Sequence, residues 1–228
     1  MYGRACILAC KNAIISSLCE DLPERQAAAL KKQVRQPILM TSVAVKNWRA
    51  WKKIGIGAVL APGAYHLGAR LGYPLTLGGY AHSSDPDTPT TITMYRYPHV
   101  NNQGLTPKQQ YRAARHELLS TPFEEIECSV RAQLGSLLKH GGFDPARDIT
   151  GITVNRWAHG YAYDLSSHAL FDTLYDDPDD PRYDHVRARK THGRIAIANS
   201  YAGASAMLES AVEQAHRGVK DVLEMAVG

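Results

Sequence analysis

The stretch that decides the fold is GRIAIANS, residues 193–200, followed by the helical pattern of residues 205–223. Residues 194–199 predict a buried strand, and residues 205–223 are amphipathic with helical spacing. The turn between them, residues 202–206, contains only small side chains. Such a turn lets the backbone approach a ligand closely, and the N–H groups at a helix start favour an anionic or electron-rich partner. Many α/β proteins contain this pattern without a ligand, so by itself it indicates only an α/β fold.

A second apolar stretch, residues 4–10, also predicts a fully buried strand. Nothing precedes it that could supply a neighbouring strand, so we expect the chain to begin in the middle of a domain and to expose strand edges that favour oligomerisation or a partner. The remaining pattern predicts helices over residues 22–30, 47–54 and about 107–139, the last broken at Thr121-Pro122, and strands over 38–45, 91–97 and 149–157.

Composition narrows the class of protein. With 228 residues, 44% of them hydrophobic, the chain is long enough to form a globular core. A net charge of +4 without a dense basic block argues against nucleic acid as a partner. No apolar run is long enough to cross a membrane and no signal peptide is present, so we expect a soluble protein, cytoplasmic by default. The four cysteines have no metal-binding spacing, so no metal site is expected, and we interpret them as small buried apolar residues.

Residues 193–222 resemble the C-terminal flavin-binding segment of the FAD-dependent amine oxidase superfamily. GRIAIANS together with EQAHRGVKDVL at residues 213–223 is especially similar to the spermidine dehydrogenase-like branch. Three distant stretches resemble the same family: residues 6–12 with Leu22-Pro23, residues 121–124 with 141–149, and residues 155–163. The resemblance therefore covers nearly the whole chain.

The resemblance implies an α/β fold with an α+β substrate part, the C-terminal half of a two-domain amine oxidoreductase. The implied division is a strand of the FAD domain in residues 1–25, a substrate-binding domain in 26–149 and the C-terminal FAD-domain segment in 150–228. The implied activity is FAD-dependent oxidation of an amine, a polyamine such as spermidine, with this chain as the C-terminal part or subunit. Haem occurs in the family but is not indicated here.

The resemblance also implies a site. The residues implied to contact the cofactor are Asn199, Ser200, Ala206, Met207, Leu208 and Trp157. Those implied to contact the substrate are Tyr161, His159 and Met207, and no catalytic residue is assigned. The Leu208 N–H at the helix start is implied to stabilise negative charge on the reduced flavin. For His159, a structural role is an equal alternative.

Several features depart from the family pattern. Met207 stands where the family commonly has tyrosine, Ala158 where it has proline and Tyr201 where it has aspartate. No GxGxxG turn for the ADP half of FAD occurs anywhere in the chain. We therefore expect a truncated protein that is inactive alone, or a subunit whose nucleotide-binding half is on a separate chain. Two alternatives stay open: a non-catalytic remnant that binds without turnover, and a related flavin oxidoreductase acting on an apolar substrate.

Overall fold

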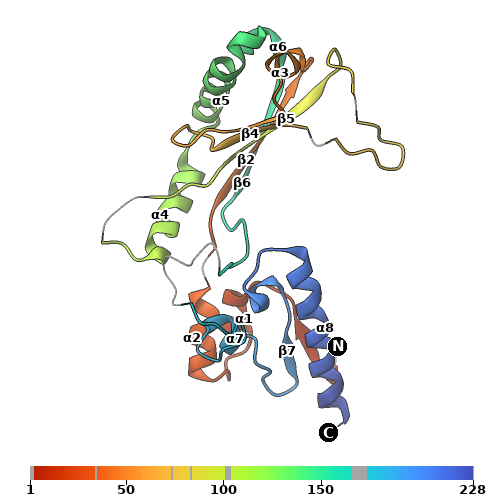
Figure 1. Cartoon of the computed structure of the whole chain (residues 1–228). Helices are drawn as coiled ribbons and strands as arrows, with labels where there is room; N and C mark the ends of the chain where they lie inside the picture. Colours follow the sequence, from red (N-terminus) through yellow and green to blue (C-terminus); the bar gives the residue numbers. More distant parts are fainter. Residues whose placement is uncertain are drawn as a thin grey trace. The chain divides into compact units, whose positions relative to one another are not determined.

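The computed structural model describes residues 3–33, 35–72, 74–82, 84–100, 104–165 and 174–227. The chain forms two compact units (Figure 1). One, the terminal unit, comprises residues 1–36 and 159–228, and the other, the inserted unit, comprises residues 37–158.

The sequence placed the two boundaries at 25/26 and 149/150. They lie at 36/37 and 158/159 because helix α2 (Glu24–Lys32) packs on α1 (Asn12–Leu18) and α7 (Asp184–Ala188), and β6 (Ile149–Trp157) pairs along its length with β2 (Ile38–Val45).

The terminal unit is built on a parallel pair of short strands. Its elements are β1 (Cys6–Leu8), α1, α2, α7, β7 (Ile195–Ile197), η2 (Ser200–Gly203) and α8 (Leu208–Val227). Cys6 pairs with Ile195 and Leu8 with Ile197. One face of the pair, including Leu8 and Ile197, packs with α1, α2 and α7. Helix α8 packs against both strands on the other face, so the pair lies between two helical layers (Figure 1).

The prediction that residues 4–10 are a fully buried strand is wrong. Strand β1 covers only Cys6–Leu8, and the Ile7 side chain is 40% exposed. In the described part of the chain, β1 has β7 as its only strand neighbour. A strand is buried on both faces and edges only where neighbours and helices surround it, and here one edge is left uncovered.

The cysteines also differ from the expectation. Cys19 is buried among α1, α2 and β7, as predicted, and burial raises the pKa of its thiol. Cys6 and Cys128 are exposed instead, and all four thiols are free. Cys6 lies on the uncovered strand β1, and Cys128 lies on a solvent-facing position of a helix. Their burial depends on neighbours that a local apolar pattern does not specify.

The inserted unit is an antiparallel sheet covered on one face by helices. Its strand order is β3-β4-β5-β2-β6. Its elements are β2, α3 (Arg49–Ile54), β3 (Ala58–Leu60), β4 (Gly68–Leu71), β5 (Thr90–Arg96), α4 (Pro107–Ser120), α5 (Phe123–Leu138), η1 (Lys139–Gly141), α6 (Pro145–Asp148) and β6. The strands predicted over 38–45, 91–97 and 149–157 and the helix break at Pro122 are confirmed within one or two residues.

Helix α5 supplies the core of the inserted unit. Ile126, Val130, Leu134 and Leu138, spaced by four residues, are fully buried. They pack with the inward face of β2, which contributes Leu39, Val43 and Val45. Alternate residues of a strand point to opposite faces, so Met40, Ser42 and Ala44 lie on the face that these helices leave open. We call this surface the open face of the inserted unit.

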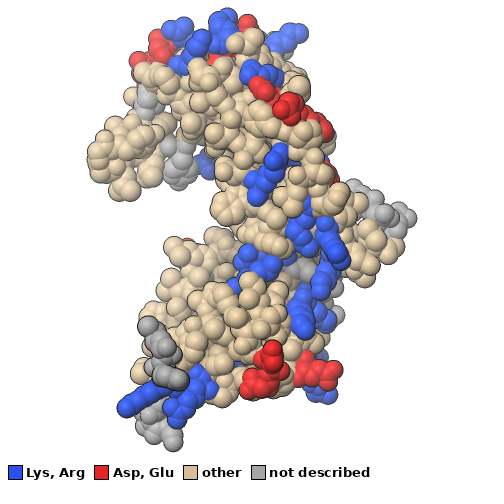
Figure 2. Space-filling view, turned by 180° about the vertical axis from the view of Figure 1, so that it is seen from behind, with Lys and Arg blue, Asp and Glu red and all other residues tan. Residues whose placement is uncertain are grey.

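None of the described helices has the length and apolar character that a membrane span requires. In the space-filling view, broad areas carry no charged side chain, and several Lys and Arg side chains stand together without Asp or Glu among them (Figure 2).

Candidate functional site

The turn between β7 and α8 is held by the side chain of Asn199. Its Nδ2 donates to the Cys10 carbonyl at 2.8 Å and to Asn12 Oδ1 at 2.7 Å, while its Oδ1 accepts from the Ala202 N–H at 3.2 Å. Asn199 thereby ties the end of β7 to the segment that follows β1 and caps η2. Through these three bonds the Asn199 amide fixes the shape of the turn.

A chain of buried amides continues from Asn199 into the turn. The fully buried Asn12 donates to Gln33 Oε1, and Gln33 Nε2 donates to the Tyr201 carbonyl at 3.3 Å. Tyr201 is 2% exposed and packs with Tyr163 and Ala204. The Arg35 guanidinium lies 4.6 Å from the centre of the Tyr201 ring. Tyr201 is thus a core residue of the terminal unit.

Two glycines allow α8 to approach the turn and the sheet. A Cβ atom on Gly203 would lie 2.1 Å from Ser210 Oγ, and one on Gly218 would lie 2.7 Å from Ala198 Cβ. Ala204 has a φ of 48°, in the left-handed region that residues other than glycine rarely adopt. This positive φ turns the chain sharply just before the helix.

The start of α8 is open to solvent. Met207 is 60% exposed and Leu208 is 76% exposed. The helix begins at Leu208, three residues later than predicted, and the Ala206 N–H that precedes it donates to Asp164 Oδ2 at 3.0 Å. The N-terminal end of a 20-residue helix carries partial positive charge, which suits a negative or electron-rich group. The carboxylate of Asp164 lies at this positive helix end.

The segment carrying Tyr161 and His159 is brought to this turn. The Leu165 N–H donates to the Ala204 carbonyl at 2.9 Å, and Tyr163 is buried beside Tyr201. Tyr161 is 51% exposed. The His159 side chain is exposed, and its carbonyl accepts from Arg35 Nη1 at 3.2 Å. The structure therefore places Tyr161 and His159 in the same unit as Asn199, Ser200, Ala206, Met207 and Leu208.

Trp157 belongs to the inserted unit and lies on its open sheet face. It is opposite Ile38 at the end of β6 and is 55% exposed. The register places Asn155 and Tyr95 on either side of Met40 on the same face. A Cβ on Gly68 would lie 2.5 Å from the Tyr95 ring, so glycine makes room for that ring. The open face thus presents aromatic, thioether and amide groups together.

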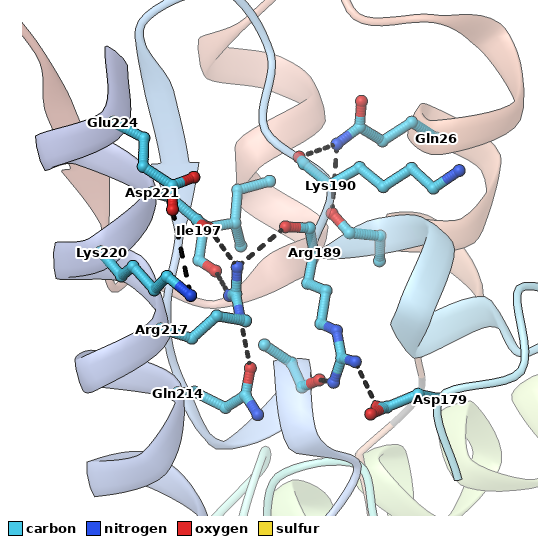
Figure 3. Close-up of polar contacts among 12 residues, drawn as sticks. Gln26, Asp179, Arg189, Lys190, Ile197, Gln214, Arg217, Lys220, Asp221 and Glu224 are labelled. Atoms are coloured by element: carbon cyan, nitrogen blue, oxygen red, sulfur yellow. Dashed lines mark hydrogen bonds and ion pairs between the residues drawn. The ribbon is translucent and has the colours of Figure 1, made fainter. Parts of the chain in front are cut away.

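Sequence reasoning missed an arginine cluster that anchors α8. Arg217 donates to the Ile197 carbonyl of β7, to Gln214 Oε1 at 2.7 Å and to Asp221 Oδ2 at 2.6 Å (Figure 3). Arg189 donates to the Ala202 carbonyl at 3.0 Å and pairs with Asp179. Burial lowers the pKa of Arg217. One sequence feature could have indicated this cluster: Arg217 is a charged residue next to Gly218, on the helix face that packs against β7.

Comparison with known proteins shows what this fold is similar to. No family model and no curated protein matches the sequence. Among solved structures, cyclohexylamine oxidase from Brevibacterium oxydans IH-35A aligns with a TM-score of 0.65 and 13% identity over 100% of this chain and 44% of its own. Putrescine oxidase bound to putrescine aligns with a TM-score of 0.60 and 15% identity over 96% of this chain and 42% of its own. The chain thus has a mixed α/β fold shared with amine oxidases and spans less than half the length of these neighbours.

Proposed function

We propose that this chain contributes the flavin-contacting segment and the substrate-binding surface of an FAD-dependent amine oxidoreductase. The observation that carries the proposal is the geometry at β7 and α8. The Asn199 side chain holds the turn by hydrogen bonds, α8 packs closely against Gly203, and the helix start at Leu208 is exposed. The likeness in fold to two amine oxidases supports the reaction class. The terminal unit would act as the FAD-domain part and the inserted unit as the substrate domain.

The described residues fit one end of the cofactor. The open start of α8 offers backbone N–H groups and a positive dipole end to the flavin ring, and Met207 and Tyr161 are exposed. The other end of FAD, the ADP half, needs a glycine-rich strand-to-helix turn, and the sequence contains no GxGxxG. In this proposal the ring end has its donors within this chain, and the ADP half is held by a separate glycine-rich turn.

The redox chemistry, removal of a hydride equivalent from the carbon next to the amine nitrogen, belongs to the flavin when it is bound. This chain's residues have other tasks. The helix start stabilises negative charge on the reduced ring. Trp157 and Met40 on the open face of the inserted unit form an apolar wall, and the Asn155 amide beside them offers a hydrogen bond. The Asp164 carboxylate near the helix start adds a negative charge that favours a cationic amine.

Within this class we propose a polyamine such as spermidine as the substrate. A second candidate, a related flavin oxidoreductase acting on an apolar substrate, is favoured by a specific observation. Met207, at the position where the family commonly has a tyrosine ring, and Leu208 beside it are both apolar and largely exposed. A ring face attracts a cationic amine, and a methionine side chain offers no such face.

The test is anaerobic reduction of the flavin-loaded protein, isolated with any polypeptide that co-purifies with it. The protein is mixed separately with spermidine, putrescine, cyclohexylamine and an apolar compound without nitrogen. The absorbance of the flavin bands is measured over time. Bleaching by amines, fastest with spermidine, is the expected result. Bleaching only by the apolar compound selects the second candidate. A colourless preparation that takes up no added FAD contradicts both.

A further inference from the structure

Helices α2 and α7 of the terminal unit enclose a groove of about 700 Å³, which we call the α2–α7 groove. Ligand pockets in proteins have volumes of about 300–1,000 Å³, so it has room for a small organic molecule. The described residues that line it lie within residues 23–32 and 181–190. None of them was assigned above to the flavin or to the amine, so the groove is a separate feature of the fold.

One face of α2 forms a wall of the groove. Four residues of the helix line it: Arg25, Ala28, Ala29 and Lys32. Their spacing of three and four residues places them on the same side of the helix, so the two alanines lie between two cations. Pro23 and Pro181 add their rings to this apolar part of the lining. A hydrocarbon group placed there is removed from water, so the wall favours a ligand with an apolar body over a purely ionic one.

The charged residues of the groove are mostly basic. The described cations that line it are Arg25, Lys32, Arg187 and Lys190, and the described carboxylate is Asp184. Asp184 pairs with Lys32 at 3.2 Å and with Arg187 at 2.5 Å. Arg25 and Lys190 have no carboxylate partner in the described part of the chain. Four cations against one carboxylate leave three positive charges in excess, out of a net charge of +4 for the whole chain. The groove therefore attracts an anion.

Gln26 holds the two walls of the groove together. Its Nε2 donates to the Ala188 carbonyl at 3.3 Å and to the Lys190 carbonyl at 2.6 Å, from a residue that is buried (Figure 3). In Figure 3 the Lys190 side chain extends from this bonded backbone, and its ammonium group makes none of the contacts drawn. A groove with walls fixed in this way is formed before a ligand arrives, which lowers the ordering cost of binding.

The unpaired cations lie at one end of the groove. The bond from Gln26 brings the start of α2, with Arg25, beside Lys190, which follows α7. At the other end, Lys32 in the last turn of α2 pairs with Asp184 at the start of α7. One end of the groove is therefore positive, whereas the charge at the other end is largely neutralised.

We propose that the α2–α7 groove binds a small organic acid with a hydrocarbon body, such as a medium-chain fatty acid. Its carboxylate pairs with Arg25 and Lys190, and its hydrocarbon chain lies along Ala28 and Ala29 toward Lys32. Charge-assisted hydrogen bonds hold the carboxylate, and removal of apolar surface from water holds the chain. This site does not depend on the flavin chemistry proposed above.

The experiment titrates the protein, isolated with any polypeptide that co-purifies with it, with octanoate in an isothermal titration calorimeter. We expect saturable binding to one site per chain. Octanol has the hydrocarbon body without the charge, and acetate has the charge without the body. Each should bind at least about tenfold more weakly than octanoate, because each loses one of the two contributions.

Variants locate the ligand. The double variant Arg25→Gln with Lys190→Gln should weaken octanoate binding about tenfold. Ala28→Trp, at an exposed position between the cations, should block the groove while leaving every charge in place. The matched control is Lys31→Gln, which removes an exposed charge of the same helix outside the groove and should leave binding unchanged. Circular dichroism checks that each variant is folded.

The other outcomes contradict the site. Octanol binding as tightly as octanoate would show only apolar association, and acetate or inorganic phosphate binding as tightly would show an ordinary basic surface. Equal losses in Lys31→Gln and in the double variant would remove the role of Arg25 and Lys190. Full octanoate binding by Ala28→Trp would place the ligand outside the groove. An absence of saturable octanoate binding at millimolar concentration overturns the proposal, whatever the flavin content of the protein.

Discussion

Gly218 of α8 lies so close to Ala198, just after β7, that a Cβ atom at position 218 would stand 2.7 Å from the Ala198 side chain. Glycine within a helix costs about 1 kcal/mol relative to alanine, so Gly218→Ala would ordinarily stabilise the protein. Here the steric conflict opposes that gain. We expect Gly218→Ala to give no stabilisation and Gly218→Val to cost about 1–3 kcal/mol in urea denaturation. Gly57→Val is the control, because nothing lies within 4 Å of its Cβ position. Equal losses in the two valine variants would argue against the close contact.

The Arg217 cluster should dominate the attachment of α8. Arg217→Ala removes hydrogen bonds to Ile197 and Gln214 and leaves Asp221 without its partner. We expect a loss of about 1–3 kcal/mol in the free energy of unfolding, measured by urea denaturation. Lys220→Ala, three residues along the helix, removes only an exposed pair with Glu224 and should cost under about 0.5 kcal/mol. Similar losses for both variants would show that the cluster does not hold the helix.

His66 should make the inserted unit sensitive to acid. Its ring is fully buried, Nε2 bonds to Thr41 Oγ1 at 3.2 Å, and Nδ1 has no partner among the described residues. Burial lowers the pKa of His66 from 6.5 to about 4. As the pH falls, the unfolded chain therefore binds the proton before the folded chain does. The free energy of unfolding is highest above pH 6.5 and falls by up to about 3 kcal/mol between pH 6.5 and about 4.

The check on His66 is urea denaturation at several pH values. His66→Gln has no group that titrates in this window and should flatten the decline between pH 6.5 and 4 by most of that amount. An unchanged slope in His66→Gln would assign the acid sensitivity to other groups.

Leu208→Asp tests whether the start of α8 receives the flavin. An aspartate in the first helical turn favours the helix, so the protein should stay folded. Its negative charge would repel the electron-rich carbonyl side of the ring. We expect the bound flavin per protein, measured by visible absorbance, to fall at least tenfold in the assembled protein. Glu209→Gln, one position further and also exposed, should retain flavin. Full flavin content in Leu208→Asp would place the cofactor elsewhere.

Met207→Tyr tests the proposed amine site. A tyrosine at this exposed position supplies a ring face that attracts a cationic amine. We expect kcat/KM for spermidine to rise several-fold, by an amount corresponding to about 1 kcal/mol, in the flavin-loaded assembled protein. Leu119→Tyr, which adds a ring at another exposed position outside the candidate site, is the control and should leave kcat/KM unchanged. Unchanged turnover with full flavin content would remove position 207 from the amine site.

Much of the architecture was predictable because it depends on local pattern. The β-branched content of β2, the alternation in β5, the four-residue spacing in α5 and the proline at the start of α4 each act within a few residues. Asn199 was singled out from the sequence as a cofactor contact, which stays a prediction. Its bonds to Cys10 and Asn12, 189 and 187 residues away, could be found only in the folded chain.

By itself, then, the sequence determined the α/β class, most helices and strands, and the small-residue turn that leads into α8. The tertiary structure alone decided which faces are covered. It showed that β1 pairs with no strand except β7 among the described residues, that Tyr201 is in the core, and that α8 turns Ser210 and Gln214 inward and Leu208, Val212, Val219 and Leu223 outward. The physical reason is that hydrophobic periodicity defines a face of a helix or strand, whereas burial depends on which distant segments pack against it.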